Sequence, residues 1–166
     1  LTDHNYGGAI SVYVSIIKID HMRILNNSSN NGGGLGFVGH GFDAVVSNSI
    51  ISGNTANDGG GIKAELGGNL RLRNTSIVNN SATGTGGGFW SHSATFVSNV
   101  LIANNTAAEA AGFYSRTLGS AHITTPTSIT WSNVTIRSNS ASGNNGAGRF
   151  EKSGGTFHFI LENALV

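Results

Sequence analysis

The stretch from Asn74 to Ala82, with the sequence NTSIVNNSA, decides the fold of this chain, because versions of it recur along the whole sequence. It is followed closely by Gly86 to Phe89, with the sequence GGGF. Written as Asn-x-x-Ile-x-x-Asn-x-Ala/Ser, the unit returns before and after this stretch, and His replaces Asn at the start of the first copy. The copies begin at His21, Asn48, Asn74, Asn99 and Asn133. The chain is therefore a repeat protein.

The period of the repeat indicates a solenoid. Successive copies of the second Asn are 27, 26, 25 and 34 residues apart, and an insertion near residues 119–128 lengthens the last interval. Self-similarity at such a period is typical of repeats that bury their apolar faces against their neighbours. Leucine-rich repeats share the period but need a leucine framework that is missing here. Helical repeats are opposed by 25 Gly and by abundant Asn, Ser and Thr.

Within each repeat, apolar residues alternate with polar ones at a period of two, which predicts short strands with one face inside. Three such strands fit in one repeat, and stacking them in register gives rungs about 4.8 Å apart. The sequence thus predicts an all-β fold, a right-handed parallel β-helix of about six coils. The coil length favours the right-handed form, since the left-handed form uses hexapeptide repeats that are absent here. The expected inward residues are Ile19, Val46, Leu72, Val97 and Trp131, then Ile17, Ala44, Leu70, Thr95 and Ile129, and after the glycine corner Ile10, Leu35, Ile62, Phe89 and Phe113.

The second Asn of each copy is predicted to form a structural ladder. Identical amides that stack along the solenoid axis can satisfy one another by hydrogen bonds, and Asn tolerates the left-handed backbone of a corner. The predicted ladder consists of Asn27, Asn54, Asn80, Asn105 and Asn139. The glycine corners lack the Gly-Lys-Ser/Thr of a phosphate-binding loop, so we interpret them as structural.

Length and composition limit the possible functions. The 166 residues fit one domain, residues 1–166. Only 10% of the residues are charged and the formal net charge is +1, so neither a nucleic acid nor an anionic membrane is predicted as a partner. No apolar run is long enough to cross a bilayer, and no cysteine is present. The repeat pattern breaks off in mid-coil at both ends, so we expect open ends that continue into a longer solenoid or contact another chain head to tail.

One outward face gathers residues that could carry chemistry. Stacking the positions after the glycine corners places Lys63, Trp90 and Tyr114 on adjacent rungs, beside Glu65, His92 and Arg116. Exposed aromatic rings among charged neighbours are typical of a carbohydrate-binding or protein-binding surface, and an ordinary surface is the third interpretation. Glu65 and His92 could exchange a proton with each other, and Arg116 could stabilise a carboxylate. Chance alignment of these residues explains the same pattern.

The sequence predicts no metal site and no cofactor. The histidines lack the spacing of metal ligands, and no acidic cluster offers the converging oxygens of a calcium site. A glycosidase needs two carboxyl groups about 5–10 Å apart. The acidic residues are expected on different faces or distant rungs, so no such pair is predicted.

Six sequons for N-glycosylation are present. Asn26, Asn79 and Asn104 lie just before the ladder Asn and should point outward at one corner of three coils. The other three begin at Asn27, Asn74 and Asn133, positions that we expect in ladders and therefore less accessible.

The segments from Asn48 to Ile62 and from Asn133 to Ile136 resemble the right-handed parallel β-helix repeats of large secreted and cell-surface proteins. They are also similar to polymorphic outer-membrane protein repeats, whose Gly-Gly-Ala-Ile stands here at Gly7 to Ile10, with Ile-x-x-Asn in place of that family's Phe-x-x-Asn. The resemblance implies an extracellular or cell-surface location. It also implies a non-catalytic structural or adhesive role, such as a subunit of a surface fibre that associates with itself or with neighbouring β-helix segments end to end. The alternative is a polysaccharide-active enzyme of the lyase, epimerase or hydrolase type, or a carbohydrate-binding β-helix.

Overall fold

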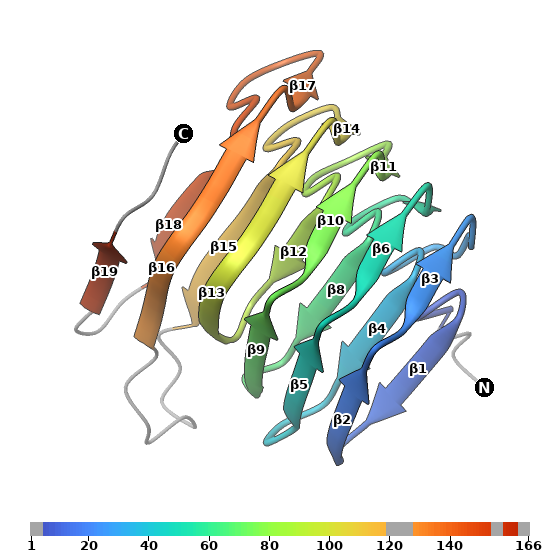
Figure 1. Ribbon diagram of the computed structural model, residues 1–166, viewed down its shortest axis with the longest axis vertical. Coiled ribbons are helices and arrows are strands. Elements are labelled where there is room, and N and C mark those ends of the chain that lie inside the picture. The colour runs from blue at the N-terminus through green and yellow to red at the C-terminus, as the bar shows by residue number, and fades with distance from the viewer. Residues whose placement is uncertain (1–4, 119–127, 154–157, 163–166) are drawn as a thin grey trace.

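The chain folds into a stack of parallel strands (Figure 1). The computed structural model describes residues 5–118, 128–153 and 158–162. In these residues every regular element is a strand and none is a helix. The insertion predicted near residues 119–128 lies outside the described part except for Ser128, which begins β16.

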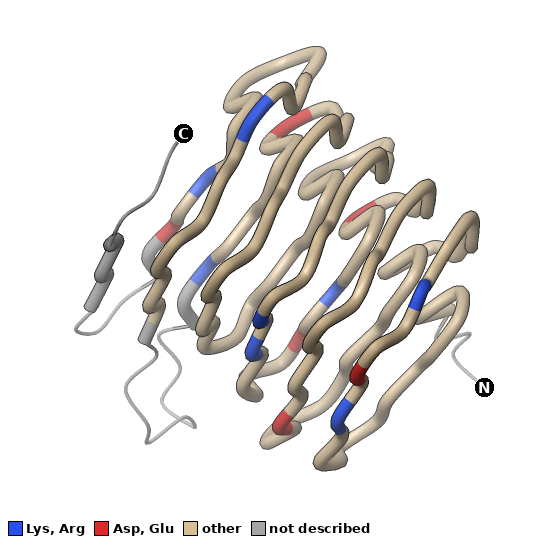
Figure 2. Tube along the Cα trace, viewed as in Figure 1, with Lys and Arg blue, Asp and Glu red and all other residues tan. Residues whose placement is uncertain are grey.

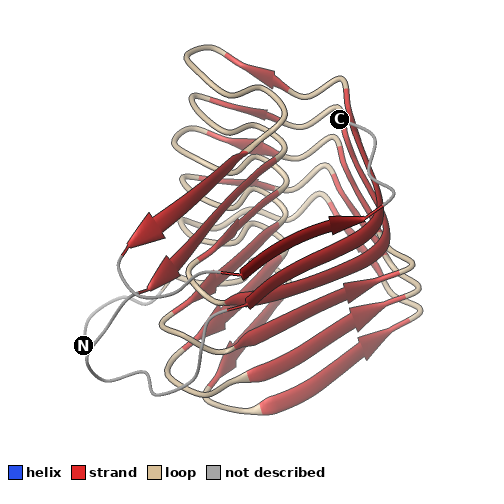
Figure 3. Cartoon of the chain, turned by 90° about the vertical axis from the view of Figure 1, so that its left-hand side faces the viewer, coloured by secondary structure: helices blue, strands red, loops and turns tan. Residues whose placement is uncertain are grey.

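Three sheets run along the stack, and Figure 3, which faces the C-terminal end, shows their strands one behind another. The first sheet follows the glycine corners and has the order β1-β4-β8-β12-β15-β18. Its strands are β1 (Ile10–Tyr13), β4 (Leu35–Val38), β8 (Ile62–Glu65), β12 (Phe89–Ser91), β15 (Phe113–Leu118) and β18 (Arg149–Ser153).

The second sheet has two halves that two long strands join. Each early coil enters it with one strand, turns at the first Asn of the repeat and continues with a shorter strand, whereas β13 and β16 run through both halves. One half holds β2 (Ile16–Asp20), β5 (Asp43–Ser47), β9 (Asn69–Arg73), β13 (Ala94–Ala103), β16 (Ser128–Arg137) and β19 (His158–Glu162), and the other adds β3 (Arg23–Leu25), β6 (Ile50–Ser52) and β10 (Ser76–Val78).

The third sheet is the smallest and corrects the predicted number of coils. It consists of the two-residue strands β7 (Thr55–Ala56), β11 (Ser81–Ala82), β14 (Thr106–Ala107) and β17 (Ser140–Ala141). The first coil contributes only an isolated bridge, from Ser28 to Thr55. Because a complete turn needs a strand in all three sheets, the solenoid has about four turns and not the six that the repeat count predicted.

The predicted register is confirmed. Ile77 of β10 pairs with Ile51 and Ile102 on the neighbouring coils, and Phe89 of β12 pairs with Ile62 and Phe113. All of these side chains are buried. At the C-terminal end, β19 pairs in register with β16, so that Phe159 stands beside Ile129 and Leu161 beside Trp131. One apolar core runs along the axis, and each coil adds side chains whose burial stabilises the fold by roughly 1.5–3 kcal/mol apiece.

Two positions of the Asn-containing repeat unit lie in the left-handed backbone region, and neither is the ladder Asn. The first Asn of the repeat has φ between 48° and 52° in its four copies, and His21 has φ 55°. The residue before the ladder Asn is also left-handed, and there Asn26, Asn79 and Asn104 alternate with Gly53 and Ser138. Asn and Gly tolerate this region better than other residues, which explains their recurrence. The sequence predicts that one Asn of each repeat both forms the ladder and has left-handed backbone. In the structure the ladder Asn forms the hydrogen bonds, and the residue before it has the left-handed backbone.

Candidate functional site

The outward row that the sequence singled out forms as predicted. Trp90 pairs in register with Lys63 on one side and Tyr114 on the other. The Trp90 and Tyr114 rings stack with centroids 5.8 Å apart, and the Lys63 ammonium lies 4.5 Å from the centroid of Trp90. At this distance a cation is attracted to the face of the indole. The first sheet therefore brings a lysine and two aromatic rings into one stack.

The prediction that these rings are exposed is wrong. Only 7% of Trp90 and 8% of Tyr114 is accessible, and Lys63 is equally buried. The cause is a second stack of chain, which we call the covering column and which consists of Tyr6, Asn31, Asp58, Thr85 and Glu109. These residues lie just before the glycine corners, and bridges join Tyr6 to Asn31, Asn31 to Asp58, and Thr85 to Glu109. Beside Glu109, Ala110 forms one buried cluster with Trp90 and Tyr114.

Lys63 anchors the covering column to the first sheet. Its Nζ donates to Oδ1 of Asn31 at 2.6 Å and lies 3.7 Å from Asp58 and 3.6 Å from Glu65. The Tyr6 hydroxyl donates to Glu65, and burial together with this carboxylate raises the pKa of Tyr6. The buried ammonium thus has a carbonyl and two carboxylate partners, as a buried charge requires.

The arrangement recurs at the C-terminal side of the row. The Tyr114 hydroxyl donates to Glu151, and Arg149 lies 3.4 Å from Glu151 and 3.8 Å from Glu109. Burial, followed by the hydrogen bond to Glu151, raises the pKa of Tyr114 to about 12. The hydrogen bond from Tyr114, aided by Arg149, lowers the pKa of Glu151. A tyrosine, an acid and a cation therefore meet at both places, and at the second the pair of Arg149 and Glu109 joins the sheet to the column.

The prediction that the acids lie apart is also wrong at these two places. Asp58 and Glu65 share Lys63, and Glu109 and Glu151 share Arg149. The sequence could not indicate this, because one acid of each pair comes from the covering column and the other from the sheet. In both pairs a cation bridges the acids, which is the geometry of an ion-pair network.

His92 and Arg116 complete the predicted face, but His92 makes no hydrogen bond to Glu65 among the described residues. Its ring packs on Trp90 with centroids 3.9 Å apart. Burial, followed by the charge of Arg116, lowers the pKa of His92 to about 4, so the imidazole is neutral at pH 7. Glu65 is instead engaged by Tyr6 and Lys63. The proton exchange considered from the sequence thus has no direct path in this geometry.

The asparagine ladder forms, and its buried amides are saturated with hydrogen bonds. The backbone N–H and Nδ2 of Asn80 both donate to Oδ1 of Asn105, at 2.9 and 3.1 Å. A second Nδ2 hydrogen bond reaches the carbonyl of Ile51, and Oδ1 of Asn80 accepts both bonds from Asn54. The same pattern links Asn27, Asn54, Asn80, Asn105 and Asn139. Every donor and acceptor of Asn54, Asn80 and Asn105 is therefore used inside the protein.

The first Asn of the repeat, which the sequence also placed in a ladder, forms a second row of amides on the surface. Nδ2 of Asn99 donates to Asn74, Asn74 donates to Asn48, and Asn48 donates to Asp20, at 2.8–3.1 Å. Ser47 and Asn48 lower the pKa of Asp20 through their hydrogen bonds. The signal was present in the sequence, since the first Asn recurs as regularly as the second.

The sequons lie where glycans could attach. Asn26, Asn79 and Asn104 are exposed at one corner of three coils, as predicted. Asn74 and Asn133 are exposed as well, which corrects the expectation that ladder positions hide them. Their left-handed backbone directs the side chains outward from the corner between the two halves of the second sheet. Only Asn27 of the six sequon asparagines is partly buried.

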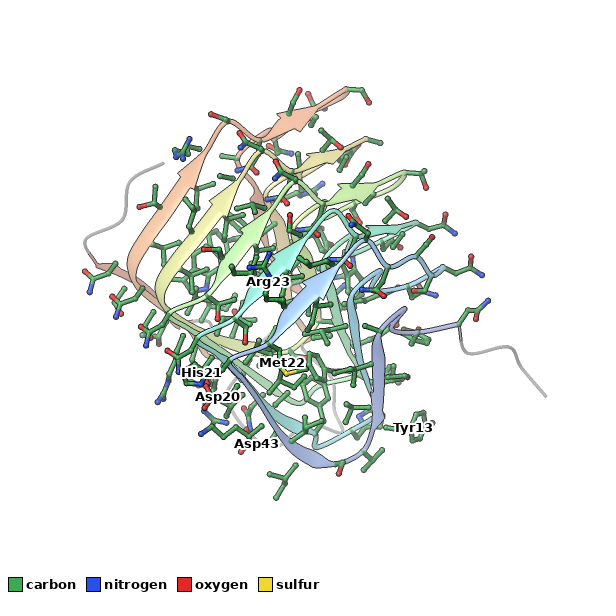
Figure 4. All side chains as sticks on the ribbon, turned by 45° about the vertical axis from the view of Figure 1, so that its right-hand side comes forward. Tyr13, Asp20, His21, Met22, Arg23 and Asp43 are labelled. Carbon is green, nitrogen blue, oxygen red and sulfur yellow. The ribbon has the colours of Figure 1, made fainter. Side chains whose placement is uncertain are left out.

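The first coil exposes an unusual amount of apolar surface. Tyr13 is 66%, Val14 54% and Ile16 84% accessible, and Met22 and Leu25 are partly exposed. Figure 4 shows Met22 close to Asp20, His21 and Arg23 at the N-terminal end of the stack, and Tyr13 at the same end but apart from them. The strands β1, β2 and β3 stand at the ends of their sheet orders. Among the described strands, none lies on the outer side of β1, β2 or β3, so this end of the solenoid combines apolar side chains with open sheet edges.

Other kinds of site can be judged from the same geometry. Charges are sparse and mixed along the stack (Figure 2). Within residues 5–118, 128–153 and 158–162, no three His, Asp or Glu side chains come together as metal ligands. That part of the chain also holds no helix with the length and apolar character of a membrane span.

Comparison of the chain with protein-family models, curated proteins and solved structures gave no match.

Proposed function

We propose that the protein is a non-catalytic structural β-helix that acts outside the cell or on its surface and joins end to end with a second copy of itself. The observation that carries the proposal is the open first coil, where Tyr13, Val14 and Ile16 are exposed beside the edges of β1, β2 and β3. An uncovered strand edge of this kind is a template for pairing with another chain. A further β-helical coil would bury these residues as each inner coil buries its own.

The asparagine ladder gives the two ends complementary chemistry. Each ladder Asn accepts at Oδ1 from the coil before it and donates to the coil after it. Oδ1 of Asn27 therefore has no donor, and the backbone N–H of Asn139 no acceptor, among the residues that the structure describes. Head-to-tail contact pairs these groups, and a heterologous contact that does not close into a ring produces a filament.

The association state of purified protein tests the proposal. We expect mass to rise with concentration in sedimentation velocity, and linear particles in electron microscopy. Ile16→Lys should abolish the assembly because it places a charge on the open edge. Ile50→Lys is the matched control, since Ile50 is partly exposed on a strand that has neighbours on both sides. A monomer at all concentrations, or unchanged assembly of Ile16→Lys, would contradict the proposal.

Extracellular location and glycosylation belong to the same proposal and are supported by the exposed sequon corner. In the reaction, the amide nitrogen of Asn26, Asn79 or Asn104 replaces the pyrophosphate of a lipid-linked oligosaccharide at the sugar carbon and loses a proton. Intact-mass analysis of protein from its natural source should give a mass above that of the bare chain. Peptide mapping should place the added mass on these asparagines. The bare mass alone would overturn this part of the proposal.

The alternative, an enzyme or binding module for polysaccharides, has less support. A sugar needs an accessible aromatic face, and Trp90 and Tyr114 are covered by Ala110 and engaged by Lys63 and Glu151. The candidate acid and base, Glu65 and His92, are not hydrogen-bonded to each other in the described part of the chain. The covered face is better explained as the attachment of the covering column to the first sheet.

A further inference from the structure

A group of hydroxyl-bearing residues lies inside the solenoid, in a core that is otherwise apolar. Ser91, Ser93, Thr95 and Ser115 are completely inaccessible to solvent. In the first sheet Ser91 pairs with Ala64 on one coil and with Ser115 on the next. Thr95 faces the same interior from the second sheet, in register with Leu70 and Ile129. The hydroxyls therefore come from adjacent coils and from two sheets.

Several of these polar atoms lack a partner. Ser91 Oγ, Ser93 Oγ and Trp131 Nε1 are buried without a hydrogen bond to any described residue, and Thr95 and Ser115 share one long contact of 3.4 Å. A buried polar group left unpaired is strongly unfavourable, and such groups in native proteins are usually satisfied by ordered water. Buried hydroxyls elsewhere behave differently. Ser49 and Thr75 donate to backbone carbonyls at 2.6 and 2.8 Å.

The side chains around the hydroxyls are small. Along the first sheet the inward row reads Phe37, Ala64, Ser91, Ser115 and Phe150, so phenylalanines flank three short side chains. The distance between facing sheets changes little from coil to coil. A serine in place of a phenylalanine therefore fills less of the space between the sheets. Short side chains and unsatisfied polar atoms thus coincide in the middle coils.

The indole of Trp131 lies next to this row. Its ring packs on Phe113 with centroids 4.5 Å apart and on Phe150 with centroids 5.0 Å apart. Phe113 precedes Ser115 by two residues on β15, and Phe150 is the register partner of Ser115. An indole N–H is only a donor, and a hydroxyl is both a donor and an acceptor. The buried hydroxyls and the Trp131 indole together therefore require a small neutral molecule that both donates and accepts hydrogen bonds.

We propose that this interior site binds ordered water, which bridges the Ser91, Ser93, Thr95 and Ser115 hydroxyls and the Trp131 indole. Water meets the need because it donates two hydrogen bonds and accepts two. An ion does not, because Lys63 is the only charged residue buried in the described part of the chain, and it lies on the outward row with partners of its own. The bound water joins the first sheet to the second and fixes the register of the middle coils, as the asparagine ladder does at the opposite corner.

A high-resolution crystal structure is the first test. We expect water within about 3.2 Å of Ser91 Oγ, Ser93 Oγ and Trp131 Nε1, and none beside the control hydroxyls of Ser49 and Thr75. In solution, NMR should show magnetisation transfer between bound water and the Trp131 indole proton. An interior without water, with the serine hydroxyls bonded to protein carbonyls, would overturn the inference.

A pair of variants gives an independent readout. If water satisfies Ser91, then Ser91→Ala removes one water contact and should lower the denaturant midpoint slightly. If the site is dry, the same change removes an unpaired polar atom and should raise the midpoint. Ser49→Ala is the matched control: it removes a buried hydroxyl with a carbonyl partner, and it should lower the midpoint in either case. A raised midpoint for Ser91→Ala would therefore refute the proposal.

Discussion

Neighbouring asparagines of one repeat have different physical roles. Asn80 is buried and bonded on every polar atom, whereas Asn79 beside it is exposed and holds the left-handed backbone of the corner. Glycine can replace the second role, as Gly53 does on the neighbouring coil, but it cannot replace the first. The ladder position should thus be far more sensitive to substitution than the asparagines around it.

Asn80→Ala should destabilise the protein by about 3 kcal/mol or more. The change removes Oδ1, the acceptor of two hydrogen bonds from Asn54, and the Nδ2 donor to the Ile51 carbonyl, at a buried position. Urea unfolding followed by circular dichroism measures the loss. Asn57→Ala is the control, because Asn57 is exposed, and we expect a change within about 0.5 kcal/mol. Equal effects of the two variants would show that the ladder contributes no special stability.

At the scale of elements, the covering column and the first sheet depend on each other. The column supplies Tyr6, Asn31 and Asp58, and the sheet supplies Lys63 and Glu65, so the contacts cross between two separate stacks of chain. A buried charge with satisfied partners is costly to disrupt, because removal of one partner leaves the others uncompensated.

Lys63→Met tests this dependence. The variant retains the apolar contact with Trp90 but leaves Asn31, Asp58 and Glu65 without their cation, so we expect a loss of about 2–3 kcal/mol. Lys18→Met is the matched control. The Lys18 side chain is 68% exposed in its ion pair with Asp20, and its loss should cost less than about 1 kcal/mol. Thermal unfolding of both variants gives the comparison, and similar shifts would argue against a special role for Lys63.

His92 makes the stability of this region depend on pH. Its pKa falls from 6.5 to about 4 in the folded protein, so between these values the unfolded chain binds more protons. Stability should therefore fall as pH decreases from about 6.5 to about 4. His92→Gln should flatten this slope, measured by urea unfolding at a series of pH values. The exposed His40 provides the control variant His40→Gln, which should retain the slope.

At the scale of the whole molecule, the solenoid has an inside and two ends but no single centre. Each coil contacts only its neighbours, and stability therefore adds up along the stack. The middle coils, with β9, β10, β11 and β12, have neighbours on both sides, whereas β1, β2 and β3 have one. The ends should open first.

Hydrogen exchange measures this gradient. In dilute solution the amides of β10 and β12 should exchange most slowly and those of β1, β2 and β3 most rapidly. At concentrations where copies associate, the proposed end-to-end contact should slow exchange in the first coil. Uniform protection along a monomer would contradict a nearest-neighbour stack, and an unchanged first coil in an assembled sample would place the contact elsewhere.

The sequence by itself determined the repeat, the inward residues and the asparagine ladder. These follow from periodicity, because stacking in register places equivalent positions such as Ile51, Ile77 and Ile102 directly above one another. Only the tertiary structure decided what covers the outward face of the first sheet. Trp90 and Tyr114 looked exposed because they alternate with inward residues, yet the covering column, whose residues lie elsewhere in each repeat, folds over them. Periodicity determines on which face of the sheet a side chain lies. Burial of that side chain depends on whether another part of the coil packs over the same face.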